Sequence, residues 1–184
     1  MALVLFYDTE GRPRRVNIDD ISGTLVGIDQ THHEIHEGNH FLYTDAVSLN
    51  DAGTQNYLIT IPDSTKYIHM IFIMEGSAIT QWQLFEGANR NGTTLQTVSN
   101  SNRNNTTAAT LTIHKGTSGG STDGTQIHIY KGGSATNQSR SGSNTRNDEE
   151  LILKRNTKYI LRTTSGTNSN LTNLRLSWYE HLTI

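Results

Sequence analysis

Short runs in which apolar and polar residues alternate dominate this 184-residue chain. From Asn56 to Ile61, the side chains of Tyr57, Ile59 and Ile61 fall on one face of an extended segment, because successive side chains of a strand point to opposite sides. Residues 66–75 form the most apolar run, which predicts a central strand buried on both faces. We predict strands over residues 3–7, 19–30, 41–43, 56–61, 66–75, 79–86, 93–98, 108–114, 125–130, 149–154, 158–164 and 171–181.

Turn residues separate these runs every 8–12 positions or so, a spacing typical of antiparallel sandwiches and jelly rolls. The sequence therefore predicts an all-β fold, with residues 31–184 as an antiparallel β-sandwich or jelly-roll-like domain and residues 1–30 as a short N-terminal arm or edge strands. We expect no amphipathic helix, an irregular segment over residues 31–40, and loops rich in Gly, Ser and Thr at 115–124 and 131–148.

Composition strengthens this picture. The chain has 26 Thr, 17 Asn and 15 Ser, about a third of all residues, and Thr favours pleated surfaces while Asn and Ser favour turns. It has no Cys, which excludes disulfides, thiolate metal sites and cysteine nucleophiles. A net charge of −2 does not suggest a nucleic-acid or anionic-membrane binder, and the N-terminus has no basic segment typical of a secretory signal. We expect a soluble protein made in a cytoplasm.

A cluster of imidazoles and carboxylates is the first candidate site. If residues 32–37 are extended, His32, Glu34 and His36 share one face, and His33 and Glu37 the other. His40 follows closely, and such a set could bind a divalent metal. Gly38 and Asn39 argue against a helix here. The alternative, which we favour, is a polar segment without metal that contacts another subunit.

Trp82 and Trp178 are the second candidate, because exposed aromatic rings can stack on sugars, although in a sandwich they more often belong to the core.

The sequence gives weaker support for other kinds of functional site. The acidic pairs are interpreted as solvated surface, and the chain has no Gly-x-Ser-x-Gly elbow and no phosphate-binding loop. We therefore predict no catalytic residue, no cofactor and no enzymatic activity.

Several stretches resemble tailed-bacteriophage virion proteins of the head-decoration type. They are HHEIHEGNHFLYTDAVSLNDAGTQNYLITIPDSTKYIHM from His32, TLTIHKGTSGGSTDG from Thr110, ELILKRNTKYILR from Glu150 and the ending Leu176 to His181. The resemblance covers most of the chain from about residue 30 onward, whereas residues 1–30 match nothing in that family.

The resemblance implies a capsid decoration, or cement, protein with a sandwich body that assembles as a homotrimer. Such a protein binds the outer capsid surface and bridges major capsid subunits, so the expected location is the virion and the expected partners are other copies and the major capsid protein. The contact residues we expect are Leu3, Leu5, Tyr7, His32, His33, Glu34, His36 and His40. An alternative is a receptor- or glycan-binding head of a tail fibre or baseplate, which would use Trp82 or Trp178.

Overall fold

The computed structural model describes residues 30–134 and 150–182, together with four two-residue strands nearer the N-terminus. The chain forms two compact units, residues 1–33 and residues 34–184. In the first unit, β1 (Phe6–Tyr7) pairs with β2 (Pro13–Arg14), and β3 (Asn17–Ile18) pairs with β4 (Leu25–Val26). No helix in the described part of the chain is long and apolar enough to span a lipid bilayer.

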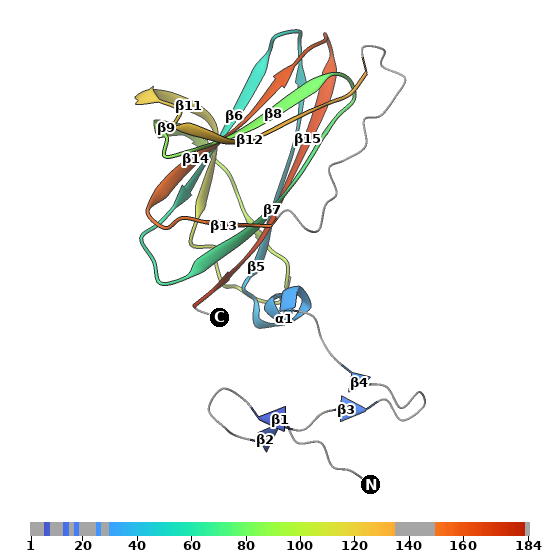
Figure 1. Cartoon of the computed structure of the whole chain (residues 1–184), viewed down its shortest axis with the longest axis vertical. Coiled ribbons are helices and arrows are strands. Elements are labelled where there is room, and N and C mark those ends of the chain that lie inside the picture. The colour runs from blue at the N-terminus through green and yellow to red at the C-terminus, as the bar shows by residue number, and fades with distance from the viewer. Residues whose placement is uncertain are drawn as a thin grey trace. The chain divides into compact units, whose positions relative to one another are not determined.

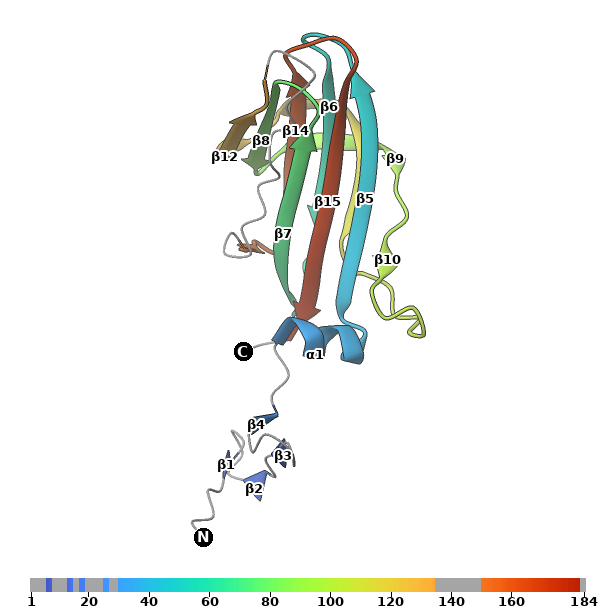
Figure 2. The same cartoon turned by 90° about the vertical axis from the view of Figure 1, so that its right-hand side faces the viewer.

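The second unit is a sandwich of two antiparallel sheets (Figure 1, Figure 2). The five-stranded sheet has the order β10-β5-β15-β7-β13 and the six-stranded sheet the order β12-β8-β14-β6-β11-β9. The strands are β5 (His40–Leu49), β6 (Thr54–Ile61), β7 (Tyr67–Gly76), β8 (Thr80–Glu86), β9 (Asn89–Leu95), β10 (Ser99–Asn100), β11 (Thr112–Thr122), β12 (Thr125–Gly132), β13 (Leu151–Leu153), β14 (Thr157–Ser165) and β15 (Asn170–His181). The predicted all-β sandwich is confirmed.

The strand order is that of a jelly roll with one insertion. Taken along the chain, β5, β7, β13 and β15 belong to one sheet and β6, β8, β12 and β14 to the other, in the spatial orders β5-β15-β7-β13 and β6-β14-β8-β12. Eight strands arranged in these two orders form the two Greek keys of a jelly roll. The insertion between β8 and β12 adds β9 and β11 to one sheet and β10 to the other.

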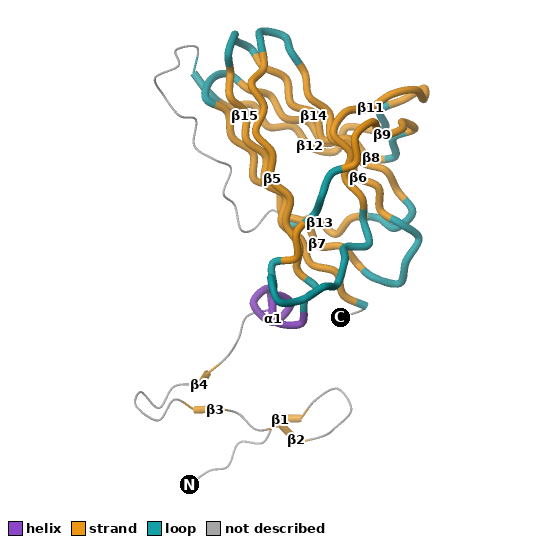
Figure 3. Tube along the Cα trace, turned by 180° about the vertical axis from the view of Figure 1, so that it is seen from behind, coloured by secondary structure: helices purple, strands orange, loops and turns teal. Residues whose placement is uncertain are grey.

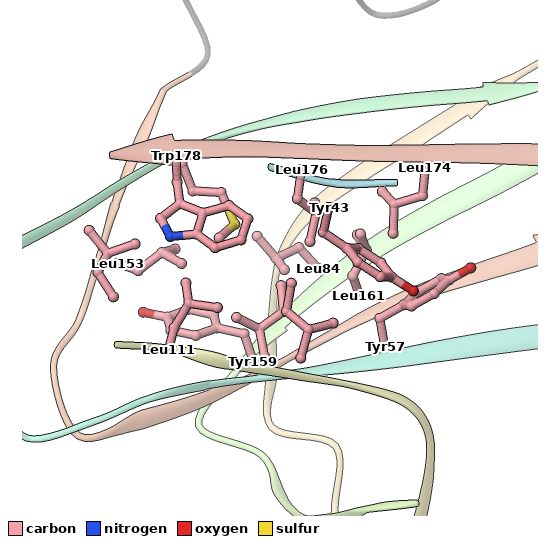
Figure 4. Packing of buried hydrophobic residues seen from close by; sticks show 14 of the residues in the cluster. Tyr43, Tyr57, Leu84, Leu111, Leu153, Tyr159, Leu161, Leu174, Leu176 and Trp178 are labelled. Atoms are coloured by element: carbon pink, nitrogen blue, oxygen red, sulfur yellow. The ribbon is translucent and has the colours of Figure 1, made fainter. Parts of the chain in front are cut away.

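The two inner faces meet in one apolar core (Figure 4). Tyr57, Ile59 and Ile61 point into it from β6, as their alternation predicts, and Leu58 points outward to a small second cluster with Ile160. Phe41 and Trp178 pack with ring centroids 5.9 Å apart, and Tyr43 meets Tyr57 edge to face. These large rings pack with Ile, Leu and Met side chains of both sheets, and their burial helps to hold the sheets together.

The predicted irregular segment at 31–40 is wrong, because residues Gln30–Glu37 form helix α1. Gly38 ends this helix with φ +78°, and the amides of Gly38 and Asn39 bond to the carbonyls of Ile35 (3.1 Å) and Glu34 (2.9 Å). This is a Schellman motif, in which a glycine just past the helix adopts a left-handed conformation. Gly38 therefore marks the end of a helix rather than its absence. Figure 3 shows α1 at the end of the sandwich where β5 begins.

The predicted loop at 115–124 is also wrong over most of its length, because β11 continues to Thr122. This part of β11 pairs with β9 and has a register shift between Ser118 and Thr122. Gly120, with φ +73°, passes so close to the backbone that an added Cβ would lie 1.6 Å from the carbonyl oxygen of Asn89. Only glycine fits this position of the strand. In the sequence alone, a glycine-rich stretch was taken to indicate a loop. Of the predicted loop 131–148, residues 135–148 lie outside the described residues.

Candidate functional site

Helix α1 carries four of the predicted contact residues. His32, His33 and His36 are exposed, whereas Glu34 is 5% exposed and accepts a hydrogen bond from Asn39 Nδ2 at 3.2 Å. Because residues Gln30–Glu37 are helical, the face that His32, Glu34 and His36 would share in an extended segment does not form. On a helix, His32 and His36 lie one turn apart on the same face.

The last turn of α1 is attached to the sandwich by asparagines of the segment after β10. Asn102 Nδ2 donates to the carbonyl of His36 at 3.2 Å, and Asn105 Nδ2 donates to that of Glu37 at 3.4 Å. Carbonyls at a helix C-terminus have no partner within the helix, so these amides satisfy them. In the described part of the chain, no group of three or more His, Asp and Glu side chains is arranged to hold a metal ion.

His40, the fifth predicted residue of this stretch, lies at the start of β5 and is buried. Its Nδ1 lies 2.6 Å from Ser101 Oγ and its Nε2 lies 3.1 Å from Ser177 Oγ. Burial lowers the pKa of His40, the Arg175 charge lowers it further, and Glu34 opposes the shift. When a serine–histidine pair acts in nucleophilic catalysis, a carboxylate usually orients the histidine through its second ring nitrogen. In His40, both ring nitrogens face serine hydroxyls. The arrangement joins β5, β15 and the segment after β10.

A second cluster, which we call the outer-face cluster, consists of His69, Glu150, Tyr179 and His181. Tyr179 Oη donates to Glu150 Oε1 at 2.8 Å, and His69 Nδ1 contacts the same oxygen atom. His69 Nε2 and His181 Nε2 are 2.8 Å apart, so one imidazole donates and the other accepts. The rings of His69 and Tyr179 stack at 4.7 Å. Burial raises the pKa of Tyr179, and hydrogen bonding to Glu150 raises it further.

Strand register brings these residues together. His40 on β5, Tyr179 on β15 and His69 on β7 are direct cross-strand partners, so they form one row across the outer face of the five-stranded sheet. Sequence reasoning found only His40 of this row, because residues 69, 150, 179 and 181 share no local motif. One signal was available: a histidine inside the most apolar strand needs a polar partner when it is buried.

The two tryptophans lie in the core, and each is only 1% exposed. Neither ring therefore has a face on which a sugar could stack at the surface, which argues against the alternative of a glycan platform at Trp82 and Trp178. Trp178 Nε1 donates to the buried carboxylate of Glu180 at 3.1 Å. The core interpretation of these rings is the correct one.

Two of the predicted contact residues in the first unit, Leu3 and Leu5, lie outside the described residues. Tyr7 belongs to β1, where its backbone is opposite Pro13.

Comparison with known proteins adds no relative. No protein-family model, curated protein or solved structure matches this chain.

Proposed function

We propose that this protein is a non-enzymatic virion assembly protein, a capsid decoration protein that binds the outer capsid surface as a homotrimer. Its N-terminal unit is the attachment element, and the jelly roll is the body that bridges major capsid subunits. The observation that carries this proposal is the division of the chain into a large sandwich and a small unit whose strands are only two residues long.

The small unit has the composition of a segment that needs a partner. Residues 1–33 contain 13 apolar or aromatic side chains, including Leu3, Leu5 and Tyr7. Its described strands form two separate two-stranded pairs. Even a full-length two-stranded hairpin is only marginally stable in water, and two-residue strands bury less apolar surface. Docking on a capsid subunit would bury these side chains, and addition of a strand to a neighbour's sheet is one way to achieve it.

The outer face of the five-stranded sheet supports self-association. Figure 2 looks onto β5, β15 and β7, and no other strand of the sandwich lies over the middle of this face. Leu42, Ile71 and Ile73 are half-buried on it, and Leu171 is 47% exposed at one end. Leu42 and Ile71 lie on either side of Ser177, and Ile73 lies beside Arg175. An uncovered sheet face that carries both apolar and polar side chains fits an interface between subunits.

Substitutions in the N-terminal unit test attachment. The full chain carrying Leu3→Ser, Leu5→Ser and Tyr7→Ser should lose co-sedimentation with purified capsids that lack the protein, and so should a chain without residues 1–30. The matched control is Thr9→Ser with Asn17→Ser and Thr24→Ser, which should bind as the unaltered chain does. Full binding by the truncated chain, with an unchanged circular dichroism spectrum, would overturn this role for the segment.

Self-association is tested with two exposed leucines. Leu171→Glu places a charge on the outer face of the five-stranded sheet, and we expect it to shift the trimer toward monomer in sedimentation velocity. Leu95→Glu is the control, because Leu95 is 63% exposed on β9 at the edge of the other sheet. Equal effects of the two substitutions would place the interface elsewhere.

A further inference from the structure

Two side chains of opposite charge lie in the middle of the outer face of the five-stranded sheet. Arg175 on β15 is exposed, and Glu75 on β7 is half-buried. Residues that are directly opposite each other on neighbouring strands share a face. Glu75 therefore lies beside Asn173, and Arg175 lies between Thr44 and Ile73. Arg175 and Glu75 are thus diagonal neighbours on one surface.

The rest of this part of the face is uncharged. Alongside β15 from Leu171 to Ser177, the other outward residues of β5, β15 and β7 are Leu, Ile, Ser, Thr, Ala and Asn. The surface therefore has one positive and one negative group and no net charge. Such a surface complements itself, because two copies attract each other where the arginine of one is opposite the glutamate of the other.

Neither charge is neutralised within its own chain. Among the described residues, Arg175 and Glu75 form no hydrogen bond and no ion pair, although the Arg175 charge lowers the pKa of His40. On the other sheet, by contrast, Arg162 bonds to Asp123 at 2.6 Å. The two opposite charges on the uncovered face thus remain available to a partner outside the chain.

Burial of this face in the proposed interface would remove both groups from water. A charge that leaves water needs a counter-charge, since an unpaired buried charge is strongly destabilising. Arg175 and Glu75 both line a depression of about 610 Å³, which is also lined by the short side chains of Thr44 and Ala46. The charged end of a side chain from a second copy can therefore approach either group without displacing a bulky neighbour.

We propose that Arg175 of one copy forms an ion pair with Glu75 of the next copy in the homotrimer. Contacts in a closed ring of three identical copies are head to tail, so a residue of one copy meets a different residue of its neighbour. Identical Arg175–Glu75 pairs at each contact would then close the ring and fix how the copies are aligned. This inference rests on the proposed homotrimer and names the contact that aligns it.

Charge reversal in the full chain, followed by sedimentation velocity, tests the pair. Arg175→Glu alone or Glu75→Arg alone places like charges at every contact, and we expect each to weaken trimer formation by about tenfold or more. The double variant Arg175→Glu with Glu75→Arg exchanges the two charges and should restore association. Lys131→Glu is the matched control, because Lys131 is exposed on β12 of the other sheet. It should associate as the unaltered chain does.

A mixture of the two single variants distinguishes a pair between copies from a pair within one chain. Each variant alone has two like charges on its outer face, but a copy of one variant presents the opposite charge to a copy of the other. Most contacts in a mixed ring of three then join opposite charges, so the mixture should recover part of the association. A pair within one chain would gain nothing from mixing.

Trimers of unchanged strength in either single variant would overturn the proposed pair. A double variant or a mixture that stays dissociated would also overturn it, provided that circular dichroism shows intact sheets. These results would leave the homotrimer itself standing. An unaltered chain that sediments as a monomer would instead contradict the homotrimer, and the pair with it.

Discussion

Two carboxylates, Asp123 beside the six-stranded sheet and Glu180 on the five-stranded sheet, are held in different ways. On the six-stranded sheet, Asp123 bonds two guanidinium groups, with Arg90 Nε at 2.7 Å and Arg162 at 2.6 Å. On the five-stranded sheet, Glu180 accepts from neutral donors, the Trp178 indole at 3.1 Å and the Thr110 amide at 3.0 Å. Glu150 likewise accepts a hydrogen bond from the Tyr179 hydroxyl and contacts His69 Nδ1. Asp123 is held by full charges of opposite sign, whereas Glu180 and Glu150 are held by hydrogen bonds from neutral or titratable groups.

This difference determines which interactions are sensitive to the solution conditions and which to the loss of a single side chain. Ion pairs between half-buried groups are screened by salt and lost when the carboxylate is protonated. Hydrogen bonds to a fully buried carboxylate are insensitive to salt, but loss of the acceptor leaves buried donors unsatisfied. The contribution of Glu180 should therefore depend on the presence of its acceptor oxygens, and that of Asp123 on the salt concentration and pH of the solution.

The largest effect is expected at Glu180, which is completely buried. Glu180→Ala removes the acceptor of both the Trp178 indole and the Thr110 amide, so we expect a loss of about 2–4 kcal/mol in the free energy of unfolding. Glu180→Gln, which keeps one acceptor oxygen, should lose clearly less. Urea unfolding followed by circular dichroism measures both. Equal losses in the two variants would show that packing, and not the hydrogen bonds, accounts for the effect.

A smaller effect is expected at Asp123. Hydrogen bonding to Arg162, with a further contribution from Arg90, holds the pKa of Asp123 below its ordinary value of 3.8. Asp123→Asn should lose about 1–2 kcal/mol of unfolding free energy at neutral pH. Because the folded-state pKa is depressed, this stabilisation is fully present above about pH 4 and is lost as pH falls through the folded-state pKa.

The pH dependence of Asp123→Asn therefore separates the ion pairs from general destabilisation. Unfolding measured at pH 7 and near pH 2.5 should show a difference between the variant and the unaltered chain that shrinks in acid. Salt at about 1 M should also reduce this difference, but not the difference between Glu180→Gln and the unaltered chain. Asp63→Asn is the control, because Asp63 is exposed in a turn after β6. A difference that stays constant in acid would contradict the ion-pair account.

The smallest effect concerns His40 on the five-stranded sheet. Its pKa is lowered by burial and by Arg175, so the folded chain prefers the neutral imidazole. The stabilisation from neutral His40 is fully present above its ordinary pKa of 6.5 and is lost as pH falls through the folded-state value. His40→Gln should flatten the decline in thermal stability below pH 6.5. An unchanged decline would assign it to other groups.

Much of the fold could be predicted because its strands bury one face. The alternation of Tyr57, Ile59 and Ile61 set the inward face of β6, and the polar turn at Arg155 to Thr157 separated β13 from β14. Helix α1 was missed because its capping glycine was taken as a sign of irregular structure. The second half of β11 was missed because Gly119 and Gly120 sit in a strand that the pairing with β9 stabilises, against local preference.

The candidate sites were much less predictable. Glu150, Tyr179 and His69 meet only through the register of β7, β13 and β15, which no local pattern encodes. Sequence reasoning therefore singled out the histidines of residues 32–40 but not the outer-face cluster, whose members come together only in the folded sandwich.

The solution mass of the purified full chain, measured by light scattering with and without EDTA, tests the assembly role most directly. The account predicts a homotrimer, three copies of the 20.4 kDa chain, in both conditions. A mass of one chain would contradict a preformed trimer. A trimer that dissociates in EDTA would contradict an assembly held by apolar sheet surfaces and would assign its stability to a bound metal.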